Sequence, residues 1–575
     1  MKILSKLNKT KIRIITAVVT IIYTAVSFYF SLPPINLQAE EFYTFFLGKA
    51  ILCFAVYYGL CAYKKFKHPE SVGVADGFDF TIKSLVKSYI IPVIVVGSIL
   101  IVLLIGSLIS APIFNAGSYH KLLNVENGNF TEDITEINFS NIPTLDKASA
   151  EKLGNKKMGE MAEWISQFEV SDLYTQINFN KRPTRVTPLL YGDFFKWWNN
   201  KSDGIPAYMR IDMVTQEVTC VKLDEGIKYS ESEYFNRNIE RHLRFKYPTY
   251  IFDTPVFEID DEGRPYWICT KLKRTIGLFG GQDVDGVVVC DAVTGECEYY
   301  EDGKIPQWID KAYSAELLIE QYDYYGRYIN GYWNTLFGQS DMKQTTEGYN
   351  YIALNDDVYV YTGVTSVSGD EANIGFVLMN QRTKETKFYS IAGAMEYSAM
   401  DSAEGQVQHL KYIATFPLLL NTAGQPTYFI PLKDNSNLVK KYSMVNVSQY
   451  QIVAIGDTIK ECEEAYIKLL KESNIIEDDA GNDVGDNTDI ADKVDIIKVE
   501  GKITDIRTAI INGNTYYYIY IDGSDKVFSI SALADEMAVM LNPGDMVVIE
   551  YEDSQANKSN VIVKIKGIKI QIKTE

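Results

Sequence analysis

Residues 285–300 read DGVVVCDAVTGECEYY, and the organisation of most of the chain can be worked out from this segment. A valine-rich run leads into Asp291-Ala-Val-Thr-Gly-Glu296, and a second apolar and aromatic run follows it. Valine and tyrosine are favoured in strands. An aspartate can accept hydrogen bonds from the turn backbone, and Gly295 suits a tight left-handed bend, so the segment predicts a β-hairpin.

The same hairpin pattern, Asp/Asn-x-x-Thr-Gly/Gln/Lys-Glu, recurs at Asp212–Glu217 and Asn380–Glu385. Each copy follows an apolar strand and precedes a second one. A second pattern places a turn glycine two residues before a proline and directly before a strand, at Gly204, Gly263 and Gly424. Recurrence of both patterns predicts antiparallel-sheet-plus-helix modules, roughly 80 to 90 residues long and about four in number.

Helical segments follow the predicted hairpins, at residues 229–243, 314–328 and, interrupted by Gly405, 394–410. A fourth, degenerate module ends in a helix that begins with a Thr458-x-x-Glu461 capping box. Its apolar face consists of Ile459, Cys462, Tyr466 and Leu469. Because one helix cannot cover the apolar face of a sheet without neighbours, we expect the modules to pack in pairs.

This strand, turn, strand and helix arrangement resembles the PepSY module, an exported bacterial domain of peptidase propeptides and of membrane-anchored regulators of cell-wall enzymes. The resemblance covers about residues 200–470, with DGVVVCDAVTGECEYY as its most specific piece. Gln216 and Lys384 stand where the family often has glycine. The resemblance implies binding or inhibition, carries over no catalytic residue and does not identify the partner. We therefore predict no catalytic residue, no cofactor and no metal site.

Three long apolar stretches occupy the first fifth of the chain, at about 14–30, 45–63 and 89–113. Each is close to the ~20 residues that a helix needs to cross a bilayer. No cleavage site of small residues follows the first stretch, and two more spans come after it, so a retained anchor is favoured over a signal peptide. Residues 1–113 are predicted to form a three-helix transmembrane anchor in contact with the lipid bilayer.

The charges predict the orientation of this anchor. Cations precede the first stretch and lie between the second and third, at Lys64 to Lys87, so both segments are predicted to be cytoplasmic. An odd number of spans then places residues 114–575 outside. The chain carries a net charge of −19, which divides into +6 for residues 1–113 and −25 for the rest. An acidic ectodomain argues against nucleic acid as a partner.

After the strand pattern of the modules, residues 473–495 are acidic and rich in Asn, Gly and Asp, which predicts a flexible linker. From residue 496 five strands alternate with turns at Asn512-Gly513 and Asp522-Gly523, and a short helix precedes the fourth strand. This pattern resembles an OB-type barrel. Tyr516, Tyr518 and Tyr520 alternate with Tyr517 and Ile519, so one of the two sets belongs to its core.

The fold class predicted for the whole chain is a helical membrane anchor plus an α+β ectodomain with a terminal OB-like β-barrel. The predicted domains are 1–113 (anchor), 114–250 and 251–345 (first and second modules), 346–472 (third and fourth modules), 473–495 (linker) and 496–575 (barrel).

Cys290 and Cys297 face each other if residues 292–295 form a four-residue loop, and a disulfide is one interpretation of the pair. Cys220, Cys269 and Cys462 bring the ectodomain cysteines to an odd total of five. The alternative is that all five are small apolar core residues, as the place of Cys462 on its helix face suggests.

The densest aromatic segment spans residues 322–333, and its candidate surface residues are Tyr324, Tyr325, Arg327, Tyr328, Tyr332 and Trp333. Tyrosine and tryptophan suit a glycan or protein surface. They also suit the core at a junction between two repeats, and this is the interpretation that we favour here and at Trp197-Trp198. The four histidines are scattered, and none of the common catalytic spacings occurs.

The leading hypothesis is a non-catalytic, membrane-anchored, extracytoplasmic protein of a bacterial cell envelope that docks or regulates another envelope protein. A scaffold subunit of an oligomeric membrane assembly, in which the repeats stack and the chain is a homo-oligomer, is the alternative. An envelope hydrolase with a nonstandard site is the third hypothesis.

Overall fold

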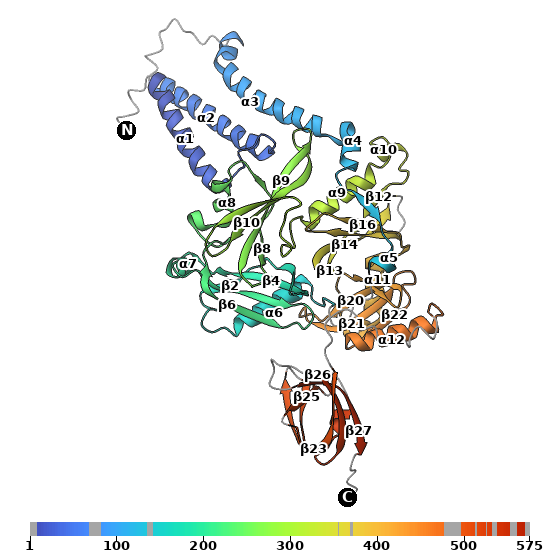
Figure 1. Cartoon of the computed structure of the whole chain (residues 1–575). Helices are drawn as coiled ribbons and strands as arrows, with labels where there is room; N and C mark the ends of the chain where they lie inside the picture. Colours follow the sequence, from blue (N-terminus) through green and yellow to red (C-terminus); the bar gives the residue numbers. More distant parts are fainter. Residues whose placement is uncertain are drawn as a thin grey trace. The chain divides into compact units, whose positions relative to one another are not determined.

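The computed structural model describes residues 9–67, 82–134, 142–354, 356–367, 372–476, 496–511, 514–524, 526–531, 537–552 and 560–569. The chain divides into two compact units, Met1–Glu477 and Asp478–Glu575 (Figure 1). Most of the predicted acidic linker, residues 477–495, and the Asn512-Gly513 turn lie outside the described residues.

Unit 1 begins with three long apolar helices, α1 (Lys9–Ser31), α2 (Glu40–Lys67) and α3 (Ile82–Ser110). Their segments Thr10–Ser31, Glu40–Tyr63 and Ile90–Ser110 are long and apolar enough to cross a membrane. Large aliphatic side chains along these segments are exposed, which in water would be costly and in lipid is favourable. The prediction of three membrane-length helices is confirmed.

Four sheets follow in unit 1. The first contains β2 (Phe168–Val170), β3 (Thr175–Phe179), β4 (Arg182–Tyr191), β5 (Ile205–Asp212) and β6 (Val218–Ile227). The second contains β7 (Ile251–Phe252), β8 (Val256–Ile259), β9 (Pro265–Ile276), β10 (Gly280–Asp291) and β11 (Cys297–Glu301). The third contains β1 (Val125–Asn127), β12 (Lys343–Thr345), β13 (Asn350–Leu354), β14 (Asp357–Ser366), β15 (Ala372–Asn380), β16 (Thr386–Tyr389) and β17 (Gly393–Ala394). The fourth contains β18 (Ile413–Ala414), β19 (Leu418–Thr422), β20 (Gln425–Lys433), β21 (Val439–Asn446) and β22 (Val453–Gly456).

Helices and short 3-10 turns accompany these sheets. They are α4 (Pro112–His120), α5 (Phe130–Asp133), α6 (Lys147–Gly159), α7 (Phe194–Asn200), η4 (Phe235–Arg237), α8 (Ile239–Lys246), α9 (Ala315–Arg327), α10 (Asn334–Phe337), α11 (Glu396–Gln406), η5 (Gln408–Leu410) and α12 (Ile459–Glu472). The predicted capping box at the start of α12 is confirmed, because Thr458 and Glu461 bond each other's backbone N–H groups.

The recurring hairpin turn has the same hydrogen bonds in all three copies. The side chain of Asp212, Asp291 or Asn380 accepts N–H groups two and three residues later, at 2.7–2.9 Å. The fifth position is left-handed each time, with φ of 61°, 76° and 66° at Gln216, Gly295 and Lys384. The predicted turn chemistry is therefore confirmed, and two copies hold a non-glycine residue in a conformation that favours glycine.

Each of the three largest cores of unit 1 is shared by two successive sheets and their helices. On β10, Val288 and Cys290 join a core with the first sheet and α8, whereas Val287 and Val289 join a core with the third sheet and α9. Successive residues of a strand point to opposite faces, so a sheet between two cores needs an uninterrupted apolar run. This explains the VVVC run of the hairpin segment.

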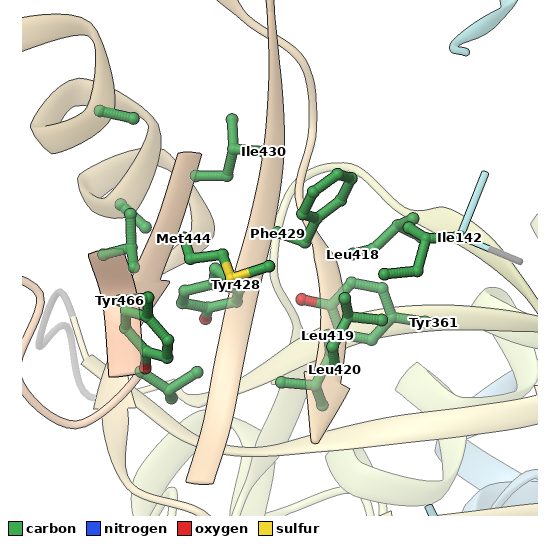
Figure 2. Packing of buried hydrophobic residues seen from close by; sticks show 14 of the residues in the cluster. Ile142, Tyr361, Leu418, Leu419, Leu420, Tyr428, Phe429, Ile430, Met444 and Tyr466 are labelled. Atoms are coloured by element: carbon green, nitrogen blue, oxygen red, sulfur yellow. The ribbon is translucent and has the colours of Figure 1, made fainter. Parts of the chain in front are cut away.

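The third core lies between the third and fourth sheets and includes α11 and α12. Figure 2 shows Tyr361 of the third sheet near Leu418 and Leu419 of the fourth, and Tyr428 near Tyr466 of α12. Successive sheets thus share the three largest cores, and a smaller cluster around Ile211 of the first sheet also packs against Val439 of the fourth, so the sheets do not form two closed pairs.

Two short strands depart from the predicted domain boundaries. β1 lies in the range predicted for the first module, 114–250, but pairs in parallel with β16 of the third sheet. β12 lies before the predicted boundary at residue 346 but pairs with β14, also in the third sheet. Such pairing depends on long-range geometry, because a three-residue strand carries almost no periodicity of its own.

Unit 2 is a closed five-stranded barrel in the order β23-β24-β25-β27-β26. Its elements are β23 (Ile496–Ile511), β24 (Asn514–Ile521), β25 (Val527–Ser531), α13 (Met537–Met540), β26 (Met546–Glu552) and β27 (Asn560–Lys569). The short helix lies between the third and fourth strands, as predicted. Ile519 is fully buried and Tyr517 packs against the same core, so this set, not Tyr516, Tyr518 and Tyr520, is the core set.

The membrane-length helices are joined to the second sheet by specific contacts. The Ser110 hydroxyl, at the end of α3, accepts the N–H groups of Leu278 and Phe279 at 3.0 and 2.9 Å, at the tip of the β9–β10 hairpin. A Cβ at Gly106 would overlap the Phe279 ring. At the end of α1, Arg244 of α8 donates to the carbonyl of Leu32 at 2.8 Å. The ends of α1 and α3 therefore hold the second sheet and α8.

Candidate interaction surface

Most tyrosines of the predicted cluster at residues 322–333 are packing residues. The rings of Tyr324 and Tyr328 lie 4.8 and 6.2 Å from the ring of Tyr119 on α4, and Tyr332 stacks on Tyr328 at 6.5 Å. These rings join α9 to the helix that directly follows α3. The sequence favoured a junction between two repeats for this cluster. For these three tyrosines, the structure instead shows packing of α9 and the residues after it against α4.

The other members of the cluster differ in their surroundings. Tyr325 stacks on His120 of α4 at 4.8 Å. Arg327 is exposed, and Trp333 stacks on Phe337 of α10, with 61% and 83% of the two side chains exposed. Of the six candidate surface residues, Arg327 and Trp333 are therefore the exposed ones.

A second aromatic surface, which the sequence reasoning missed, lies on α7 and η4. Three of its five residues expose more than half of their surface: Phe195 is 75% exposed, Phe235 58% and Trp198 55%. We call it the α7–η4 patch and define it as Phe194, Phe195, Trp198, Tyr234 and Phe235. Phe194 links the two elements, because its ring lies 5.1 Å from Tyr234 and 6.2 Å from Trp198.

The patch rests on a buried polar base. Trp197, the buried residue of α7, donates its indole N–H to Glu233 at 2.6 Å, and the Tyr191 hydroxyl donates to the same carboxylate at 3.0 Å. Burial raises the pKa of Glu233, although both hydrogen bonds act in the opposite direction. The carboxylate therefore ties α7 to the segment that carries Tyr234 and Phe235, so the patch is held in one arrangement.

The rim of the patch carries cations. The Lys201 ammonium lies 3.3 Å from the centroid of the Trp198 ring, and the carbonyl of Lys201 accepts a hydrogen bond from Arg237 at 2.6 Å. Phe235 has φ of 55°, a left-handed backbone that costs a non-glycine residue roughly 1–2 kcal/mol. An exposed aromatic residue held in that conformation, beside cations, suits contact with a partner that offers apolar and acidic groups.

The sequence contained a signal for this patch in FFKWW, residues 194–198, where four of five residues are aromatic. Only Trp197 is buried, so Trp198 is not the junction residue that the sequence reasoning favoured. A helix of seven residues is too short for its periodicity to tell the buried face from the exposed one.

The other predicted site is the cysteine pair. Cys290 and Cys297 are direct partners in the β10–β11 ladder, and their sulfur atoms are bonded in a disulfide. Among the described residues, no three His, Cys, Asp or Glu side chains gather in a way that would hold a metal ion.

No family model matches the chain, and no curated protein matches it. Among solved structures, the chain is similar to an ACO/RPE65 chimera in a monoclinic crystal form, at 8% identity. The alignment covers 70% of this chain and 62% of the chimera, with a TM-score of 0.13. The chain therefore spans less than two thirds of that protein, and a likeness this weak supports no inference on fold or activity.

Proposed function

We propose that the chain is a non-catalytic docking or regulatory protein of a bacterial cell envelope, anchored by three transmembrane helices. The observation that carries the proposal is the α7–η4 patch. Exposed aromatic residues on a buried, hydrogen-bonded base are typical of protein-binding sites, because little side-chain freedom is lost on binding. The partner class that fits is an envelope protein with an apolar, acidic surface.

The orientation with a cytoplasmic N-terminus and extracytoplasmic residues 114–575 is part of this proposal. Cations on the predicted cytoplasmic segments support it. The contacts of Ser110 with the second sheet and of Leu32 with α8 support it too, since the end of α3 and the end of α1 would then be on the ectodomain side.

The resemblances to the PepSY module and to the OB-type barrel are also part of the proposal. Three hairpin turns with the same hydrogen bonds support tandem PepSY-like modules. The barrel order, with β25 and β27 parallel and β26 closing on β23, supports an OB-like unit.

Photocrosslinking in intact cells tests the docking surface. A photoreactive residue at position 195 should capture a distinct envelope protein, and combining it with Trp198→Ala and Phe235→Ala should abolish that capture. The matched control places the residue at position 337 and adds Trp333→Ala, at the exposed end of the other aromatic cluster. Capture from position 337 alone would refute the patch as the docking site, and capture of a second copy of the chain would favour the scaffold alternative.

A further inference from the structure

α8 and the tip of the β9–β10 hairpin lie beside the last turns of the membrane-length helices (Figure 1). The segments long enough to cross a membrane end at Ser31 of α1 and at Ser110 of α3. Because a helix rises about 1.5 Å per residue, the contacts of the two elements can be placed along each helix by counting back from these ends.

The hairpin tip packs on a glycine inside the apolar segment of α3. A Cβ at Gly106 would overlap the side chains of both Leu278 and Phe279. The Phe279 ring also lies 5.7 Å from the ring of Tyr43 on α2. Gly106 precedes the end of its segment, Ser110, by four residues, so the tip reaches about 6 Å along the helix from that end.

Two arginines fix α8 at the end of α1. Arg241 donates to the carbonyl of Tyr29 at 3.2 Å, and Arg244 donates to the carbonyl of Leu32 at 2.8 Å. The last carbonyls of a helix have no partner within the helix. In lipid such a carbonyl must be satisfied by the protein itself, and here α8 supplies the donors.

Phe245 of α8 lies beside the last turn of α1. Its ring is 6.2 Å from the ring of Phe28 and 6.2 Å from that of Tyr29. Phe28 precedes the end of its segment, Ser31, by three residues, or about 5 Å along the helix. Phe245 is 53% exposed, and Phe30 of α1 is 72% exposed. Phe245 therefore extends the exposed apolar surface of α1 onto α8.

Packing in the core does not account for this phenylalanine. Ile239 and Leu243 are the apolar residues of α8 that are buried, in the core that the first two sheets share. Phe245 follows Leu243 by two residues, so it lies on the opposite side of the helix, where a helix facing water carries polar residues. Lys246, the next residue, is exposed, and a lysine at this level can extend to the phosphate groups of lipids.

We propose that α8 lies in the interfacial layer of the bilayer on the ectodomain side, with Phe245 among the lipid acyl chains. The partner is the lipid surface, because the exposed side of α8 is continuous with the apolar surface of α1 and the hairpin tip reaches a similar depth on α3. The second sheet is then held against the membrane. The inference rests on the membrane anchor of the proposed function and not on the α7–η4 patch.

Fluorine NMR on the full-length protein in phospholipid nanodiscs tests the depth of this side chain. A single 4-trifluoromethylphenylalanine replaces Phe245. Its relaxation is measured with dissolved oxygen, which concentrates among the acyl chains, and with a charged gadolinium chelate, which stays in water.

Two control proteins carry the same label elsewhere. One has it at Tyr450, which is 48% exposed between β21 and β22 of the fourth sheet, and the other at Ile101, which is 58% exposed in α3. We expect the ratio of the oxygen effect to the gadolinium effect at position 245 to be at least about threefold higher than at position 450. The ratio at position 101 should be the highest of the three, because Ile101 lies deeper in the apolar segment.

The controls separate this inference from the anchor on which it rests. A high ratio at position 101 with equal ratios at 245 and 450 overturns the inference and leaves the membrane anchor intact. A low ratio at position 101 refutes the anchor itself, and the inference with it. A label at position 245 that responds to neither agent is covered by protein, which also overturns the inference.

Photocrosslinking in the same nanodiscs gives a second, independent measurement. Benzoylphenylalanine at position 245 should form adducts with phospholipid that intact-mass spectrometry detects, whereas the same residue at position 450 should form none. Equal yields of lipid adduct at the two positions contradict the insertion of α8.

Discussion

Glu258 should make the junction of the first three sheets less stable as the pH rises toward neutrality. Its side chain is fully buried on β8, and its two oxygens accept the N–H groups of Asp310 and Lys311 at 3.0 and 2.9 Å. Burial raises the pKa of Glu258 to about 7, against the effect of both hydrogen bonds. Burial and Glu258 itself also raise the pKa of Asp310 well above its usual range.

The sign follows from the proton that the folded state retains. Below about pH 4.5 Glu258 is neutral in the folded and the locally opened state, so its contribution is constant. Between about 4.5 and 7 the opened state releases the proton and the folded state keeps it, so stability is lost as the pH rises. At 1.36 kcal/mol per pKa unit the loss reaches about 3 kcal/mol, and Asp310 acts in the same direction.

Hydrogen exchange followed by mass spectrometry, on full-length protein between pH 4.5 and 7.5, measures this effect. After correction for intrinsic exchange rates, protection of residues 305–313 should fall by up to about a hundredfold. Glu258→Gln should flatten the slope, and at pH 4.5 it should cost about 1–3 kcal/mol, because one N–H loses its acceptor. Glu262→Gln, an exposed glutamate before β9, should leave the slope unchanged. Protection that stays flat or rises with pH in wild type would refute the reasoning.

Local signals in the sequence were sufficient for the elements that depend on neighbouring residues. The hairpin turns, the capping box of α12 and the membrane-length helices each require a few residues at fixed spacing, and all three are present as predicted. The register of the β10–β11 hairpin follows from the loop length, which is why Cys290 and Cys297 could be placed opposite each other.

Contacts between distant segments could not be predicted in the same way. β1 pairs with β16, which lies almost half the chain further along the sequence, and a strand of three residues has no pattern that would predict this pairing. Glu258 looked like one of many carboxylates, because its burial depends on Asp310 and Lys311, some 50 residues later. The α7–η4 patch likewise depends on which face of a short helix is covered by its neighbours.

Two further predictions concern the connections of the second sheet. Ser110→Ala removes the acceptor of the Leu278 and Phe279 N–H groups and should destabilise the β9–β10 tip by about 1–3 kcal/mol, seen as faster hydrogen exchange at residues 276–280. Ser98→Ala, whose hydroxyl donates to the Val95 carbonyl of the same helix at 2.9 Å, is the control, and equal exchange in both variants would contradict the assignment. Peptide mapping without reductant should recover Cys290 linked to Cys297, and changing both to Ser should lower stability by about 2 kcal/mol. Free thiols at both positions would contradict this prediction.

One position of the repeat is aromatic in all three copies and accounts for two of the 40 tyrosines of the chain. The turn pattern Gly-x-Pro-x-aromatic ends at Tyr208, Trp267 and Tyr428, each buried in a shared core. Each polar tip bonds a backbone carbonyl of another segment, those of Gly263, Tyr229 and Ala394, at 2.8–2.9 Å. An aromatic ring with a polar tip fills the core and satisfies a carbonyl at its edge, which phenylalanine cannot do. Three of the five members of the α7–η4 patch are phenylalanines, so the core function that accounts for these repeat aromatics does not account for the patch.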